Sequence, residues 1–60
     1  MKPKDLIKIL KEEGWEIKEQ RGSHIQLVHK DIKGKITVPY HNTDLKIGTL
    51  NSILKQAGLK

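Results

Sequence analysis

The chain has 60 residues with a net charge of +5 and no cysteine, so it has neither disulfides nor a thiolate metal cluster. A chain of this length buries only about 60% of the surface that its unfolded form exposes, which predicts one domain, residues 1–60, with one small core. No apolar run approaches the roughly 18 residues of a membrane span, and residues 1–15 lack a signal peptide's apolar centre, so we expect a soluble protein of the reducing cytoplasm.

The first predicted element is a helix over residues 3–13. Proline is tolerated in the first turn of a helix, where Pro3 lies, because the N–H that it lacks would have no partner there. Gly14 can adopt the left-handed conformation that ends a helix. The apolar stripe that identifies the helix consists of Leu6, Ile7 and Leu10, with Ile9 at its margin.

Three strands are predicted next, over residues 15–20, 24–29 and 36–38, because apolar and polar residues alternate with period two. The first two strands are joined by a tight turn, in which Gly22 supplies the positive φ that a hairpin needs. Proline has no donor for a strand ladder, so Pro39 ends the third strand or lies on the edge of the sheet. These strands form an antiparallel meander.

Successive residues of a strand point to opposite faces, so the sheet is expected to have one apolar and one polar face. Trp15, the one large aromatic side chain, is interpreted as the central packing residue. The core face is expected to carry Trp15, Ile17, Ile25, Leu27, Ile36 and Val38. The opposite face is expected to carry Glu16, Lys18, His24, Gln26, Val28, Lys35 and Thr37.

A polar loop over residues 40–44 offers side chains that can cap a second helix, predicted over residues 47–57. Its apolar stripe has the spacing i, i+3, i+4 and i+7 and consists of Leu50, Ile53, Leu54 and Ala57. The order α-β-β-β-α predicts an α+β fold in which both helices cover the apolar face of a three-stranded antiparallel sheet. The other face of the sheet then stays free.

The candidate functional residue is His24, which a Gly22-Ser23 turn delivers to the first position of the second strand. Histidine titrates near neutrality, so an exposed imidazole can take or give a proton. Ser23 is interpreted as a turn residue, because neighbours on a strand point to opposite faces and His24 is badly placed to activate it. The competing interpretation is that His24 is an ordinary solvated residue at a strand end.

Positive charge is concentrated after residue 19. There the basic residues Arg21, Lys30, Lys33, Lys35, Lys46, Lys55 and Lys60 face only Asp31 and Asp44. Clustered basic residues attract phosphates, which predicts a nucleic-acid partner, although solubility alone also explains extra lysines. The candidates for holding phosphates are Lys18, Arg21, Lys33 and Lys35.

Proton transfer beside a positive surface suits cleavage of RNA. The 2′-hydroxyl of RNA is an internal nucleophile next to the scissile phosphate, so a positioned base and a cationic clamp suffice without metal, whereas DNA lacks this hydroxyl. The three histidines, at positions 24, 29 and 41, have no metal-ligand spacing, and no phosphate-binding loop of the GxxxxGK[ST] type occurs. We therefore predict no metal and no cofactor.

Four stretches in order resemble the HicA toxins of prokaryotic toxin-antitoxin pairs: Gly14-Trp15, Gly22-Ser23-His24, Val38-Pro39-Tyr40-His41, and residues 48–59. The resemblance implies a fold like the double-stranded RNA-binding domain and an mRNA endoribonuclease activity that is independent of translation. It also implies neutralisation by a HicB antitoxin that covers the active surface, hence a hetero-oligomer with the antitoxin and a monomeric free toxin.

In that family the histidine of the Gly-Ser-His motif is catalytic, which implies a catalytic role for His24. The histidine of the Pro-x-His motif matches His41, for which a structural role and a second catalytic role both stay open. Cleavage ordinarily needs an acid and a base, so the second group would be His41, a lysine or water. Two further interpretations stay open: a non-catalytic RNA-binding module, and a domain that docks a protein on its free sheet face or edge strand.

Overall fold

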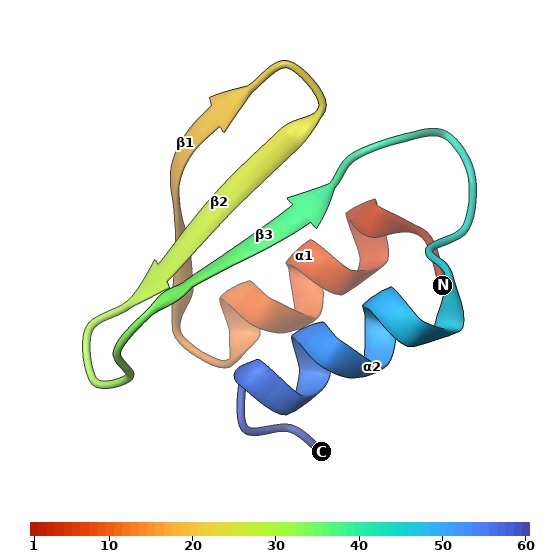
Figure 1. The fold of residues 1–60 in the computed structure, drawn as a ribbon. Helices are drawn as coiled ribbons and strands as arrows, with labels where there is room; N and C mark the ends of the chain where they lie inside the picture. Colours follow the sequence, from red (N-terminus) through yellow and green to blue (C-terminus); the bar gives the residue numbers. More distant parts are fainter.

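The computed structural model describes all 60 residues as a helix, three strands and a second helix (Figure 1). The elements are α1 (Pro3–Glu12), β1 (Trp15–Arg21), β2 (His24–His29), β3 (Lys35–Pro39) and α2 (Ile47–Gln56). The predicted α-β-β-β-α order is confirmed, with every boundary within one residue of its expected position. This order also fits the fold of the double-stranded RNA-binding domain.

The sheet is an antiparallel meander with β2 in the middle and β1 and β3 at the edges. Gly22 has φ +55° and no non-glycine residue has a positive φ, so the two-residue turn before His24 has the sign pattern of type II′. Pro39 is the last residue of the edge strand β3, where its missing N–H interrupts no central ladder.

Both helices cover the same face of the sheet and run side by side in the same direction (Figure 1). Their starts are joined, because the Leu45 N–H donates to the Met1 carbonyl at 2.9 Å. One hydrophobic core lies between the layers and consists of Leu6, Ile7, Leu10, Trp15, Ile25, Leu27, Ile36, Val38, Ile53 and Ala57. Full burial of an aliphatic side chain contributes roughly 1.5–3 kcal/mol, so this small set stabilises the whole chain.

The prediction that Ile17 belongs to the core is wrong, because 43% of this residue is exposed. Strand β1 carries a β-bulge in which Ile17 pairs with Leu27 and Glu19 with Gln26, while Lys18 has no partner. A bulge bends its strand and increases the local twist. The β1–β2 hairpin turn projects away from both helices (Figure 1). The helices accordingly leave Ile17 partly uncovered.

The prediction that the loop over residues 40–44 caps the second helix is also wrong. The residue before α2 is Lys46, and no side chain caps the helix there. Gly48 lies in the first turn of α2, and a Cβ added to it would meet nothing within 4 Å. Gly48 is therefore a first-turn residue rather than a point of close backbone contact.

Candidate active site

The structure places His24 on the sheet face that no helix covers. His24 is exposed, whereas Ile25 and Leu27, the next residues that point to the helices, are 5% and 0% exposed. His24 pairs with Arg21 on β1 and with Pro39 on β3. The Tyr40 N–H donates to the Ser23 carbonyl at 2.6 Å, which ties the turn before His24 to the end of β3. The backbone of His24 is thus fixed by pairing with β1 on one side and β3 on the other.

The three histidines differ in what their rings contact. The His24 ring forms no hydrogen bond within the chain, so both of its nitrogens are available to a ligand. The Asp31 N–H donates to Nδ1 of His29 at 3.0 Å, and Nε2 of His29 lies 3.0 Å from the Glu13 carbonyl. Because Nδ1 accepts, the proton of a neutral His29 is on Nε2 and is donated to that carbonyl. His29 is therefore a structural residue.

His41 lies past the end of β3 in an exposed loop. It borders a shallow pocket with Lys2, Pro3, Tyr40 and Asn42. No strand pairing and no hydrogen bond connects it with His24. His41 also lines a second pocket together with Pro39, the strand partner of His24, so it borders the candidate site without a hydrogen bond to His24.

Arg21 stands directly across the hairpin from His24. Its Nε lies 3.3 Å from Oε2 of Glu19, an ion pair on the same face of the sheet. The Arg21 side chain is 80% exposed, so most of the guanidinium remains free for an anion. Arginine presents several N–H donors in a planar fork that matches phosphate geometry, which suits this position to a phosphate bound beside the imidazole.

Glu19 reaches this face only because of the bulge at Lys18. Strict alternation from Ile17 would send Glu19 to the core side, so sequence reasoning did not include it in the site. With the bulge, Glu19 pairs with Gln26, two residues along β2 from His24, and is therefore its diagonal neighbour across the strands. Diagonal neighbours are about 7–8 Å apart, so both can contact one phosphodiester group. The sequence did contain one indication of the bulge: strict alternation assigns Glu19, a charged residue, to the core face.

The other predicted phosphate-binding residues are exposed but do not cluster with Arg21. Lys18 is the extra residue of the bulge, and Lys33 lies in the loop between β2 and β3. Lys35 pairs with Val28, four residues along β2 from His24, which is about 13 Å at the usual rise of a strand. Lys35 is therefore not a near neighbour of His24 on this face.

No group of three or more His, Cys, Asp or Glu side chains is placed to hold a metal ion. No helix has the length and apolar composition needed to cross a bilayer.

The fold and this face define a small basic α+β protein that holds an unbonded imidazole and a guanidinium together on an exposed sheet. The sequence model of the HicA toxin of bacterial toxin-antitoxin pairs matches residues 3–59. The chain therefore belongs to the HicA toxin family, as its motifs predicted, and this membership implies a toxin with an antitoxin partner. A search of curated proteins finds no match.

Proposed function

We propose that this toxin is an endoribonuclease that cleaves mRNA by acid–base chemistry at His24 and requires no metal ion. The observation that carries the proposal is the exposed imidazole of His24, free of internal hydrogen bonds and paired across the hairpin with Arg21. Membership of a toxin family supplies the biological context, since degradation of mRNA stops growth. The basic surface favours a polyanionic substrate.

Cleavage needs two proton transfers around one phosphate. A base removes the proton of the 2′-hydroxyl, and the 2′-oxygen then attacks phosphorus to form a cyclic phosphodiester. The bond between phosphorus and the 5′-oxygen breaks, and an acid gives that oxygen its proton. RNA with the 2′-oxygen replaced by hydrogen cannot follow this route.

Glu19 is the second proton-transfer group in this proposal, in place of His41. A carboxylate can accept a proton, and an imidazolium can donate one from either ring nitrogen. We assign Glu19 as the base toward the 2′-hydroxyl and His24 as the acid toward the 5′-oxygen. Arg21 adjoins both groups, since it pairs with His24 across the hairpin and forms an ion pair with Glu19. Its guanidinium stabilises the charge that develops on the phosphate.

The lysines contribute affinity rather than chemistry. Lys18, Lys33 and Lys35 are exposed at different distances from His24, so each is assigned to a phosphate that flanks the scissile one. Each phosphate contact releases counterions and adds about 0.7 to the salt slope for a single strand. Binding should accordingly weaken steeply with added salt.

The test compares purified wild-type protein with His24→Ala on an mRNA fragment. We expect a 10²- to 10⁴-fold slower cleavage by His24→Ala, the usual effect of removing an acid–base group, with nearly unchanged RNA affinity. Cleavage by the wild type should persist in EDTA. Wild-type protein that binds the fragment without shortening it would exclude the nuclease and leave a non-catalytic RNA-binding module.

A pair of further variants tests the second group. Glu19→Gln should slow cleavage at least 10-fold, because an amide cannot accept the proton. His41→Ala should keep cleavage within about 2-fold of the wild type and serves as the matched control. The opposite pattern would transfer the second role from Glu19 to His41.

The remaining proposals concern assembly and location. The partner is a HicB-like antitoxin that binds the toxin in a hetero-oligomer, while free toxin is monomeric and acts in the cytoplasm on its mRNA substrate. Membership of the toxin family supports the antitoxin.

A further inference from the structure

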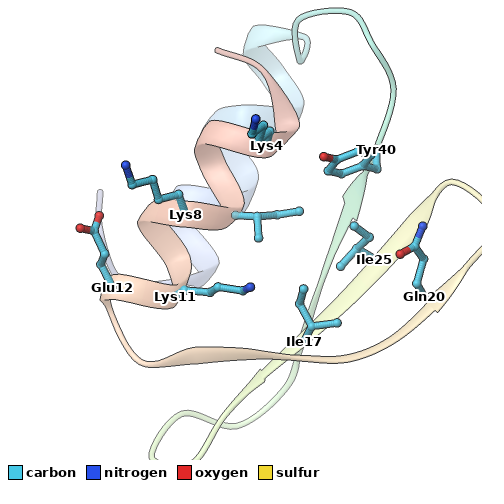
Figure 2. Close-up of a pocket in the computed structure, with 9 residues that line it drawn as sticks. Lys4, Lys8, Lys11, Glu12, Ile17, Gln20, Ile25 and Tyr40 are labelled. Carbon is cyan, nitrogen blue, oxygen red and sulfur yellow. The ribbon is translucent and has the colours of Figure 1, made fainter.

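A groove of about 640 Å³ lies on the helix-facing side of the sheet, between α1 and the β1–β2 hairpin (Figure 2). Its apolar surface is formed by Ile7 on α1, Ile17 and Ile25 on the hairpin, and Tyr40 at one end. Ile17 is 43% exposed and Tyr40 is 38% exposed. Uncovered apolar side chains at the edge of a core are a usual feature of protein-docking sites.

The rim of this groove on the α1 side is basic. Lys4, Lys8 and Lys11 follow one another along the helix, and Glu12 is the one acid in the lining. None of the three lysines forms an ion pair within the chain. Figure 2 shows the Lys11 side chain reaching across the groove toward Ile17. An apolar surface beside unpaired ammonium groups is complementary to an apolar segment flanked by carboxylates.

We propose that this groove binds an acidic amphipathic segment of the antitoxin. Apolar side chains of that segment cover Ile17 and Tyr40, and its carboxylates pair with Lys4 and Lys11. The proposal rests on the toxin–antitoxin pairing that the family implies, and it is independent of whether His24 cleaves RNA.

The groove and the face that carries His24 are two separate surfaces of the sheet. Strand β1 separates the two: Ile17 and Gln20 line the groove, whereas Glu19 and Arg21 lie on the open face with His24. A partner anchored in the groove therefore needs only to pass around the edge strand β1 to reach the catalytic side. Neighbouring strands are about 5 Å apart, so this distance is short.

RNA fits the groove less well than a protein segment does. Nucleic-acid interfaces are polar and use aromatic stacking and phosphate contacts, whereas the apolar part of this groove consists mainly of three isoleucines. Tyr40 is the one aromatic ring in the groove, and it lies at the end. The lysines alone would suit phosphates, but the exposed isoleucine beside them gains only from an apolar partner.

The experiment measures the affinity of the purified toxin for the purified antitoxin encoded with it, by calorimetry. The toxin carries His24→Ala in every sample, so that cleavage has no part in the result. We expect Ile17→Asp and, separately, the double change Lys4→Glu with Lys11→Glu to raise Kd at least 10-fold. Lys55→Glu makes the same charge change on α2, outside the groove, and should leave Kd within 2-fold.

Exchanging the charges of the two partners tests whether the toxin lysines pair with antitoxin carboxylates. Replacing the acidic residues of the antitoxin segment by lysine should restore at least part of the binding to the Lys4→Glu, Lys11→Glu toxin. Because Ile17→Asp could disturb folding, thermal melts accompany each variant, and the double lysine change provides the second, surface-only test. An unchanged Kd for the double lysine variant would overturn the proposal. A toxin dimer that Ile17→Asp dissolves, or a loss of RNA affinity without a loss of antitoxin affinity, would also overturn it.

Discussion

The two ends of strand β2 carry one histidine each, and the two rings differ in every contact. His24, at the start of the strand, points to the open face, and its ring forms no hydrogen bond within the chain. His29, at the end, points to the helix side, where both ring nitrogens are bonded and the ring packs edge-on against Trp15 with centroids 5.2 Å apart. An odd separation along a strand puts two residues on opposite faces, and this alone produces the difference.

His24 and His29 have the same side-chain chemistry, so their different contacts come from their positions in the sheet. An imidazole whose donor and acceptor are both used stabilises the turns around it and has no free atom for a substrate. An imidazole without partners contributes little to folding and keeps its proton chemistry available. We therefore expect the start of β2 to serve function and its end to serve stability.

The largest effect on stability is expected at Gly14, which lies against His29. A Cβ at Gly14 would come within 2.7 Å of Nε2 of His29, and the backbone there has φ +98°. Gly14→Ala should lower the free energy of unfolding by about 3 kcal/mol, since the left-handed conformation costs roughly 1–2 kcal/mol and the clash displaces the ring. The matched control is Gly34→Ala, which has φ +96° but open space around it. Urea melts in which both variants lose the same stability would show that the His29 contact is unimportant.

The next effect is expected from His29→Ala. This change removes two hydrogen bonds, each worth about 0.5–1.5 kcal/mol, and an edge-on ring contact of similar size. The free energy of unfolding should fall by about 2 kcal/mol, whereas His24→Ala, at an exposed site without contacts, should change it by less than about 0.5 kcal/mol. Equal losses for the two variants in thermal or chemical unfolding would remove the distinction between the two ends of β2.

The smallest effect is expected at Lys35, on the same face as His24 but about 13 Å away along β2. Lys35→Gln should weaken RNA binding uniformly across sequences and reduce the slope of log K against log salt by about 0.7 for a single strand. The rate of cleavage at saturating RNA should not change. A slower rate at saturation would instead mean that Lys35 contacts the reacting phosphate.

Most of the fold could be predicted from the sequence because its apolar residues repeat with clear periods. Ile25, Leu27, Ile36 and Val38 alternate without interruption, which fixes the register of β2 and β3 and leaves only the open face for His24. Leu6, Ile7 and Leu10 identify α1 in the same way, and their burial is confirmed.

The bulge in β1 could not be predicted in this way. Residues 18–21 are all polar, so no apolar side chain reports which of them faces the core, and a register is weakly specified where neither face is apolar. This one insertion moves Glu19 to the open face and accompanies the exposure of Ile17. The proposed catalytic role of Glu19 and the proposed docking groove thus both depend on residues 18–21, where the alternation of apolar and polar residues gives no information.

Chemical rescue of a His24 variant is the most direct test of whether this imidazole transfers the proton. His24→Gly removes the ring and leaves space on the open face, so free imidazole added to the buffer can take its place as the proton donor. We predict that His24→Gly alone does not cleave RNA and that imidazole restores cleavage in proportion to its concentration. Full cleavage by His24→Gly without imidazole would contradict the assignment of His24 as the group that transfers the proton.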